Sequence, residues 1–269
     1  MRAPVITFLS DYGLEDHFVG VCHGVFTAIC PQARVIDVTH GIPRHDARVG
    51  ALVLAAALPY MPVGVHVAVV DPDVGARRRA VALGVADERV LVGPDNGVLL
   101  MAAERLGGVT QAVEISTSPF RSEPVSATFH GRDIFAPVAA HIAAGAPLAE
   151  VGEPCDPGSL VRLEVPRSEI DDGAIVAHAI YLDRFGNVAL NVGHEELAGT
   201  GMKLGHRVEV KVAGTAHQAQ YARTFADVGP DELLIYEDAD RRLSLAVRHG
   251  DAAARLGLLR DAELRIRPL

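Results

Sequence analysis

The stretch that decides the fold is Val5-Ile6-Thr7-Phe8-Leu9 together with the residues that follow it up to position 38. The first of these residues form a short apolar run, as a buried strand requires. Apolar residues then recur at the spacing of one helical face until Pro31, namely Phe18, Val19, Cys22, Val25, Phe26 and Ile29. A second strand pattern covers 35–38. The order strand, helix, strand predicts the beginning of a sheet that is covered by helices.

The same alternation continues to about residue 150. Further strands are predicted at 65–70, 80–85 and 89–92, and further helices at 49–58, 98–106 and 134–144. The pattern is typical of an α/β domain in which a central sheet is flanked by helices on both faces.

From residue 160 onward, short strand patterns are separated by turn residues. They lie at 160–165, 174–182, 188–191, 207–212, 233–236, 243–247 and 264–266, with one short helix at 251–256. Such a series predicts a small all-β barrel or sandwich. The change falls at 152–159, a stretch rich in proline, glycine and aspartate. We therefore predict an N-terminal α/β domain at residues 1–155 and a C-terminal β-barrel-like domain at residues 156–269.

Composition excludes several classes of protein. Of the 269 residues, 49% are hydrophobic, which is too many for a disordered chain, and the net charge of −9 argues against a nucleic-acid partner. No apolar run reaches the roughly 18 residues of a membrane span, and the N-terminus lacks the pattern of a signal peptide. Cys22, Cys30 and Cys155 show no metal-binding spacing. We therefore expect a cytoplasmic protein with reduced thiols, no membrane association and no resident metal.

Polar side chains follow several of the predicted strands. Asp11 follows the first strand, Asp71 follows 65–70, and Asp95-Asn96-Gly97 follows 89–92. Ligands bind at the carboxyl ends of strands in sheets of this kind, so these residues are candidates for a site. Each has a structural alternative: Asp16, a little further along, could cap the next helix, and 95–97 is favoured as a plain turn.

Two further segments carry a dense set of chemical groups. In Thr128-Phe129-His130-Gly131-Arg132-Asp133, an imidazole, a guanidinium and a carboxylate stand at the start of an apolar helix pattern. In Asp183-Arg184-Phe185-Gly186-Asn187, a carboxylate, an aromatic ring and an amide follow a strand. A carboxylate such as Asp11 can accept both hydroxyls of a ribose diol, an amide can pair with an adenine edge, and a phenyl ring can pack on a purine.

The common nucleotide and hydrolase motifs are missing from the sequence. It contains no Gly-x-Gly-x-x-Gly after a strand, no Walker loop, no Gly-x-Ser-x-Gly and no His-Glu-x-x-His. His40, His45 and Asp46 could bind a metal, but solvated loop residues are the favoured interpretation.

Several blocks in the right order resemble the S-adenosylmethionine (SAM) hydrolase, or SAM hydroxide adenosyltransferase, family, which is related to the fluorinase and chlorinase. The similarity runs from Thr7 to about Ile266, and the strongest blocks are Ser10-Asp11-Tyr12-Gly13, Val35-Ile36-Asp37-Val38-Thr39-His40, Val69-Val70-Asp71-Pro72, Gly93-Pro94-Asp95-Asn96-Gly97 and the two segments quoted above. The resemblance implies hydrolysis of SAM to adenosine and methionine, without a cofactor, by a homotrimer whose sites lie at subunit interfaces.

The resemblance also implies residue roles. The catalytic triad of the hydrolases maps onto Asp71, Arg78 and His130. Related halogenases have tyrosines in place of Asp71 and His130, and the fluorinase has a serine in place of Gly131, which favours water over halide as the nucleophile. The implied substrate-binding residues are Asp11 for the ribose diol, Asp16 and Asp183 for the methionyl amine end, and Phe129, Phe185 and Asn187 near the adenosyl group.

Two departures from the family pattern bear on the site. Asp73 replaces a glycine, and Ala239 replaces a serine that holds the methionyl carboxylate, so Arg241, Arg242 or backbone amides are the remaining candidates for that task. His45 occupies a position near the substrate in relatives.

The sequence leaves open which residue accepts the proton and which of several functions the protein has. Either Asp71 or His130 could take the proton of the water, because their titrations would be coupled. A chlorinase and a non-catalytic SAM- or adenosine-binding protein are the alternative functions.

Overall fold

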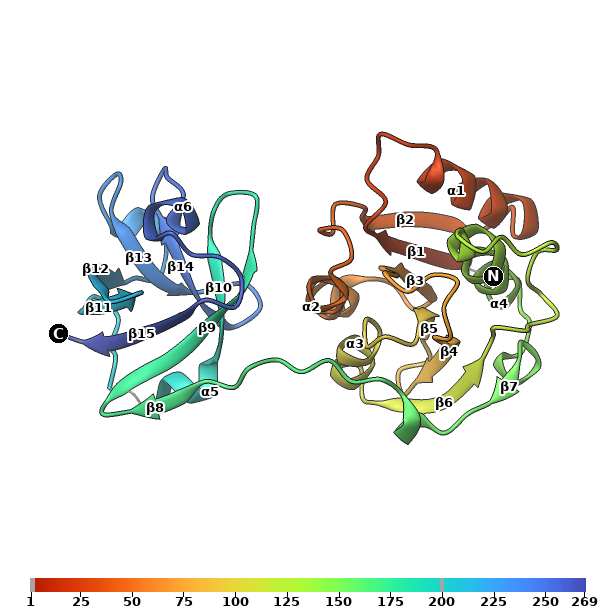
Figure 1. Cartoon of the computed structure of the whole chain (residues 1–269). Helices are drawn as coiled ribbons and strands as arrows, with labels where there is room; N and C mark the ends of the chain where they lie inside the picture. Colours follow the sequence, from red (N-terminus) through yellow and green to blue (C-terminus); the bar gives the residue numbers. More distant parts are fainter. Residues whose placement is uncertain (1–2, 199–200) are drawn as a thin grey trace. The chain divides into compact units, whose positions relative to one another are not determined.

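The computed structural model describes residues 3–198 and 201–269, which form two compact units, Met1–Leu163 and Glu164–Leu269 (Figure 1). Residues just after 155 pack with the first unit. Arg79 Nη1 donates to Ser159 Oγ at 3.0 Å, and the amide of Val161 donates to Asp95 Oδ1 at 2.9 Å. The domain boundary after residue 155 stays a prediction.

The first unit is built on a seven-stranded sheet in the order β2-β1-β3-β5-β4-β6-β7. The strands are β1 Val5–Ser10, β2 Arg34–Thr39, β3 Val65–Val69, β4 Ala80–Val85, β5 Val90–Pro94, β6 Val109–Glu114 and β7 Glu153–Pro154. β2, β1, β3 and β5 are parallel, whereas β4, β6 and β7 pair antiparallel. The carboxyl ends of the four parallel strands therefore share one edge, where Asp11, His40, Asp71 and Asp95 follow them.

Two pairs of helices cover the sheet. The helices are α1 Phe18–Ile29, α2 Ala47–Ala57, α3 Leu100–Arg105 and α4 Ala136–Ala143, and α4 is preceded by a π-helical turn, Gly131–Phe135. α1 packs against α4 and α2 against α3, with one pair on each face of the sheet (Figure 1). The buried rings of Phe8 and Phe26 meet edge to face in the core beneath α1. The predicted α/β domain with helices on both faces is confirmed.

The second unit is a closed β-barrel. Its strands are β8 Glu169–Asp171, β9 Ala174–Leu182, β10 Val188–Gly193, β11 Arg207–Val212, β12 Thr215–Tyr221, β13 Leu233–Glu237, β14 Arg242–Val247 and β15 Glu263–Pro268. They follow the order β10-β14-β13-β12-β11-β15-β9-β8, and an additional β9–β10 pairing closes seven of them. Two short helices, α5 His194–Ala198 and α6 Ala252–Leu256, accompany the barrel. The predicted barrel is confirmed.

Short 3-10 turns complete the described structure, at Leu58–Tyr60, Leu148–Glu150, Pro157–Ser159 and Phe225–Asp227. In the part of the chain that the structure describes, no helix combines the length and the apolar character that crossing a membrane demands.

The sequence pattern was wrong at 160–165 and silent at β6, β7, β8, β12 and α5. The strand predicted at 160–165 does not form, because the amide of Val161 bonds to the Asp95 carboxylate instead of to a neighbouring strand. β6 and β12 had no predicted counterpart. In β12 most side chains are polar or exposed, so no alternating apolar pattern marks it, and it is the ladders to β11 and β13 that make it a strand.

Candidate active site

Asp71, Arg78 and His130 form one hydrogen-bonded cluster in the first unit. Arg78 Nε donates to both carboxylate oxygens of Asp71, at 2.9 and 3.0 Å, and Nη2 makes a further, short contact with Oδ2. The same Nη2 lies 2.8 Å from His130 Nδ1. The structure therefore brings together the three residues that the sequence predicted as a triad, although they span β3, the following loop and the start of the α4 segment.

Arg78 is held from several sides, unlike its two arginine neighbours. Its side chain is 8% exposed, and its guanidinium carbon lies 5.2 Å from the centre of the Phe135 ring. Arg77 is exposed, and Arg79 turns to Asp95, with Nε at 2.9 Å from Oδ2. Arg78 is therefore no surface arginine, and the turn interpretation of Asp95 fits its contacts with Arg79 and Val161.

The contact with Arg78 decides which nitrogen of His130 carries the proton. A guanidinium only donates, so Nδ1 must accept, and the proton of the neutral ring lies on Nε2. Burial, and then the charge of Arg78, lower the pKa of His130, while Asp71 acts in the opposite direction. His130 is therefore neutral around pH 7.

The turn after His130 leaves no room for a side chain at Gly131. A Cβ built there would lie 2.2 Å from the hydroxyl oxygen of Tyr12. Tyr12 also meets the Phe129 ring edge to face, at 6.0 Å between ring centres. Burial raises the pKa of Tyr12 well above its ordinary value, and the Asp11 and Asp71 carboxylates add to this effect, so its hydroxyl stays protonated.

Tyr12 is therefore a neighbour of the triad that our sequence analysis missed. The only available signal was its place directly after Asp11.

The loop that holds Asp71 has one position with a left-handed backbone, and it is Gly75. Gly75 has φ 81°, and a Cβ there would lie 2.4 Å from the carbonyl oxygen of Ala127. Asp73 is not among the residues with positive φ, so replacement of the family's glycine by aspartate causes no backbone strain. The close approach of Gly75 to Ala127 brings the Asp71 loop against the segment that leads to His130.

One carboxylate oxygen of Asp11 is held by a backbone hydrogen bond. Its Oδ2 accepts a hydrogen bond from the backbone amide of His45 at 2.9 Å, and His45 has a left-handed backbone with φ 65°. Asp16 is exposed, and α1 begins after His17 without a side-chain cap, so the capping interpretation of Asp16 was wrong.

Two predicted groups of the 128–133 segment have structural contacts. Phe129 is 9% exposed and packs edge to face on Phe18, at 5.1 Å between ring centres. Asp133 pairs with Arg132 and accepts a hydrogen bond from the amide of Ser126 at 2.8 Å. Both shape the segment that carries His130.

In the second unit, the loop between β9 and β10 is organised by Asp183. Its Oδ1 accepts the amides of Phe185 and Asn187 at 2.8 and 2.9 Å, and its Oδ2 accepts the side-chain amide of Asn187 at 2.8 Å. The side chain of Phe185 points away from the barrel core and is 72% exposed. The side-chain carbonyl oxygen and the second amide hydrogen of Asn187 take no part in these contacts.

The turn between β13 and β14 follows Tyr236, a residue of β13. Burial raises the pKa of Tyr236 to about 12, and the Asp238 and Asp183 carboxylates add to the effect, which places both near its ring. Asp238 accepts the amides of Asp240 and Arg242 at 2.9 and 3.0 Å. Those amides are already engaged, which leaves the Arg241 and Arg242 side chains as candidates for a carboxylate ligand.

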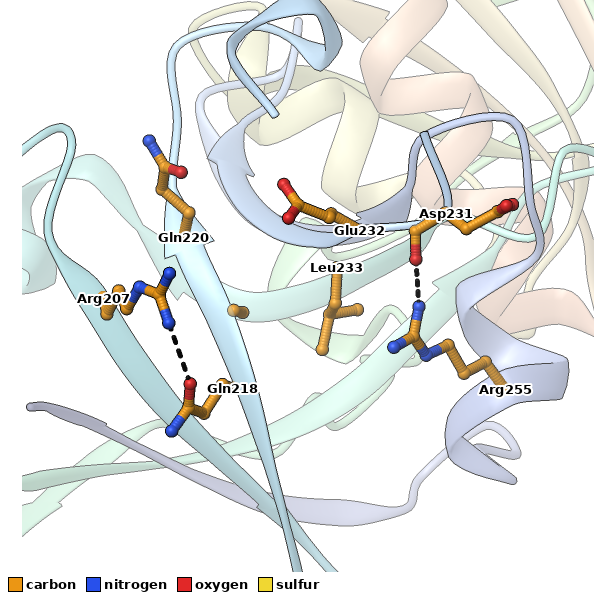
Figure 2. Close-up of a pocket in the computed structure, with 8 residues that line it drawn as sticks. Arg207, Gln218, Gln220, Asp231, Glu232, Leu233 and Arg255 are labelled. Atoms are coloured by element: carbon orange, nitrogen blue, oxygen red, sulfur yellow. Dashed lines mark hydrogen bonds between the residues drawn. The ribbon is translucent and has the colours of Figure 1, made fainter. Parts of the chain in front are cut away.

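A separate pocket of about 180 Å³ opens on the barrel and is lined by Arg207, Gln218, Ala219, Gln220, Asp231, Glu232, Leu233 and Arg255 (Figure 2). Arg207 Nη1 donates to Gln218 Oε1 at 3.1 Å, and Arg255 bonds to the backbone carbonyl of Asp231 (Figure 2). None of the predicted site residues lines it.

The metal alternative built on His40, His45 and Asp46 does not assemble. Asp46 caps α2 by accepting the amide of Val49 at 3.0 Å, and His45 is exposed. Among the residues that the structure describes, His40 groups with His23 and Asp37 instead.

Comparisons with known proteins show the family of the chain. The chain matches the SAM hydroxide adenosyltransferase N-terminal domain over residues 6–152 and the C-terminal domain of the same name over residues 177–265. It is 49% identical to a (R)-S-adenosyl-L-methionine hydrolase of Salinispora tropica, over 98% of this chain and 97% of the relative.

A fluorinase of Nocardia brasiliensis is more distant, with 29% identity over 85% of this chain and 84% of the fluorinase. Among solved structures, an uncharacterized conserved protein from Thermotoga maritima superposes with a TM-score of 0.91 at 35% identity, covering 97% of this chain and 99% of that one. The two matched domains fall within the α/β unit and the barrel unit of the structure. The chain belongs to the SAM hydroxide adenosyltransferase family.

Proposed function

We propose that the protein hydrolyses S-adenosyl-L-methionine to adenosine and L-methionine. The observation that carries the proposal is the Asp71–Arg78–His130 cluster, which is charged, largely buried and hydrogen-bonded, in a chain of this family. The hydrolase relative is 49% identical to this chain, whereas the fluorinase is 29% identical.

The reaction needs a positioned water and a proton acceptor. The oxygen of water forms a bond to the ribose C5′ as the C5′–S bond breaks, and the electron pair leaves with sulfur, so methionine departs as a neutral thioether that needs no acid. The attacking oxygen becomes strongly acidic as its bond to carbon forms. A carboxylate is then a sufficient base, provided that it is held in line with the reacting bond.

We assign the proton acceptor to Asp71. The Nδ1 lone pair of His130 is directed at Arg78, whereas Oδ1 of Asp71 has a further lone pair beyond its single contact with Arg78 Nε. Arg78 orients Asp71 and His130, and a hydrogen bond from His130 to the backbone of Ser126 helps to hold the ring. No step of this scheme calls for a metal or a cofactor.

Substrate binding is divided between groups on the two units. Asp11 is assigned to the ribose diol, Asp16 and Asp183 to the methionyl amine end, and Phe185 and Asn187 to the adenine. Phe129 packs on Phe18 and thereby helps to hold the segment that carries His130. We propose that the protein is a cytoplasmic homotrimer with its sites at the subunit interfaces. The exposure of Phe185 supports a site that another copy of the chain completes. The Arg241 and Arg242 side chains are the candidates for the methionyl carboxylate.

The decisive experiment follows the oxygen atom. Protein treated with a chelator is incubated with SAM in H₂¹⁸O, and the products are identified by mass spectrometry. Hydrolysis at C5′ predicts adenosine that carries ¹⁸O in its 5′-hydroxyl, together with methionine. Adenosine without the label would overturn the mechanism.

The alternatives have their own signatures in the same assay. 5′-Chloro-5′-deoxyadenosine formed in saturating chloride would identify a chlorinase, and tight binding without turnover would identify a SAM- or adenosine-binding protein. The loss of activity after chelation would identify a metal-dependent hydrolase.

A further inference from the structure

Three side chains of the first unit converge on one point outside the triad. His23 lies on α1, Asp37 lies on β2, and His40 follows β2. The Nε2 atoms of His23 and His40 lie 2.8 and 3.0 Å from Asp37 Oδ1, and one ligand atom from each residue lies within 4.8 Å of the others. We call these three residues the His23 cluster.

His40 is the most constrained member of the His23 cluster. It is 5% exposed, its ring packs on Phe8, and its Nδ1 lies 2.7 Å from the hydroxyl of Ser10. Its Nε2 is buried and points toward Asp37, yet among the described residues it makes no hydrogen bond of acceptable geometry. A buried ring nitrogen without a hydrogen bond is costly, so the Nε2 atom of His40 calls for a partner.

The spacing of the His23 cluster suits a metal ion. Ligand atoms at about 2.0–2.1 Å from a tetrahedral zinc ion lie about 3.3 Å from one another. The two imidazole–carboxylate distances of 2.8 and 3.0 Å need to grow by only a few tenths of an ångström. Two imidazoles and one carboxylate are ligands that zinc and its neighbours accept, and the Ser10 hydroxyl is an outer partner of the kind that orients a metal-binding histidine.

The cluster is also open to solvent and carries negative charge. The side chains of His23 and Asp37 are 35% and 39% exposed, which gives an ion a path of entry and leaves a position for water. The negative charge is that of the Asp37 carboxylate.

We propose that His23, Asp37 and His40 bind one divalent transition-metal ion of the zinc type, as a structural site separate from the triad. The ion would tie α1 and the end of β2 to the loop after β1. Ser10 directly precedes Asp11, and the amide of Gly13 donates to the carbonyl oxygen of His40 at 2.9 Å. The site therefore braces the loop that carries Asp11 and Tyr12, whatever the reaction of the triad.

The test measures metal, with activity as a second readout. Tag-free full-length protein is stripped with a chelator, dialysed against zinc, desalted, and analysed for bound zinc. One zinc per chain and a raised melting temperature are expected. Cobalt in place of zinc should give visible absorption bands of a nitrogen- and oxygen-ligated ion. Zinc-free protein should keep the ability to turn over SAM, since the triad lies elsewhere.

Matched variants locate the ion. His23→Gln and Asp37→Asn should each weaken binding by more than the roughly 10- to 100-fold that outer partners of metal ligands contribute. His194→Gln is the control, because His194 also bonds to a carboxylate, that of Glu237, but no second histidine joins them in the described structure. Melting temperatures in chelator show whether the variants fold.

The zinc content of the wild type and of the variants decides between two outcomes. Zinc retained by the wild type and by His194→Gln but lost from the two cluster variants supports the site. No retained zinc in the wild type, or equal zinc in wild type and His23→Gln, overturns it and leaves the cluster a hydrogen-bonded network.

Discussion

The loops that follow β3 and β9 each carry an aspartate within their first two residues, but the two carboxylates have different partners. Asp71 bonds to the guanidinium of Arg78, which also contacts His130, and 52 positions separate these last two residues in the chain. Asp183 bonds to amides of its own loop, on Phe185 and Asn187. The first carboxylate belongs to a charged cluster assembled from distant segments, whereas the second shapes a local turn.

The comparison shows how the same residue type can have different roles in two loops. A carboxylate that accepts several amides of its own loop fixes the conformation of that loop. A carboxylate paired with a guanidinium that also contacts a distant segment sits in a position set by the fold. Substitutions should therefore affect catalysis at Asp71 and loop geometry at Asp183.

The largest effect is expected for Asp71→Asn. The amide keeps the size of the side chain but removes the charge and the proton acceptor, so kcat should fall by about 10²- to 10⁴-fold. Initial rates of adenosine release measure this effect. Asp73→Asn, an exposed change in the same loop, is the control. Wild-type kcat in Asp71→Asn would contradict the assignment of the base.

Gly131→Ser is expected to destabilise the triad region. The new Cβ would lie 2.2 Å from the Tyr12 hydroxyl, and overpacking of this kind costs about 1–3 kcal/mol. Denaturant unfolding measures the change in the free energy of unfolding. Tyr12→Phe removes the clashing hydroxyl, so the double variant should regain much of the loss. A Gly131→Ser protein as stable as the wild type would show that the site is looser than its contacts indicate.

Phe185→Ala is expected to affect binding and to leave stability unchanged. The ring is 72% exposed, so its loss should change the free energy of unfolding by less than about 0.5 kcal/mol. Lost stacking on adenine should weaken binding by about 1–3 kcal/mol, which appears as a higher KM. Arg184→Ala, at the exposed neighbouring position, should leave KM near the wild-type value. An unchanged KM in Phe185→Ala would remove Phe185 from the site.

Asp183→Asn sharpens the comparison, because it is the same chemical change as at Asp71. One amide oxygen can still accept the Phe185 and Asn187 amides, and the bond to the Asn187 side chain is the one lost. We expect kcat to stay within about tenfold of wild type, since no proton acceptor of the reaction is removed. A fall in kcat as large as that of Asp71→Asn would erase the distinction between the two loops.

The smallest effect is expected from pH. Burial and Arg78 lower the pKa of His130, and the cluster requires an unprotonated Nδ1. The rate kcat/KM should therefore be constant around pH 7 and fall only below the ordinary histidine value of about 6.5. Because the folded pKa is the lower one, the unfolded chain binds more protons below 6.5, and the contribution to stability is lost as pH falls. His130→Asn should abolish that part of the pH dependence of unfolding.

Much of the fold follows from local patterns. Apolar runs and helical spacing predicted β1, α1, β2 and the barrel strands, because buried faces impose periods of two or 3.6 residues. β6 and β12 escaped prediction, since their buried residues are too few to form such a period. The strand expected at 160–165 failed because a side-chain acceptor, Asp95, captured the amide of Val161.

The sequence by itself determined the two-unit architecture, the family, and the placement of Asp71 and Asp11 after parallel strands. The family resemblance had already picked Arg78. Only the tertiary structure decided that His130 carries its proton on Nε2 and that Tyr12 fills the space beside Gly131. The physical reason is range. Strand and helix periods are set by neighbours along the chain, whereas a charged cluster is set by packing among segments that meet only after folding.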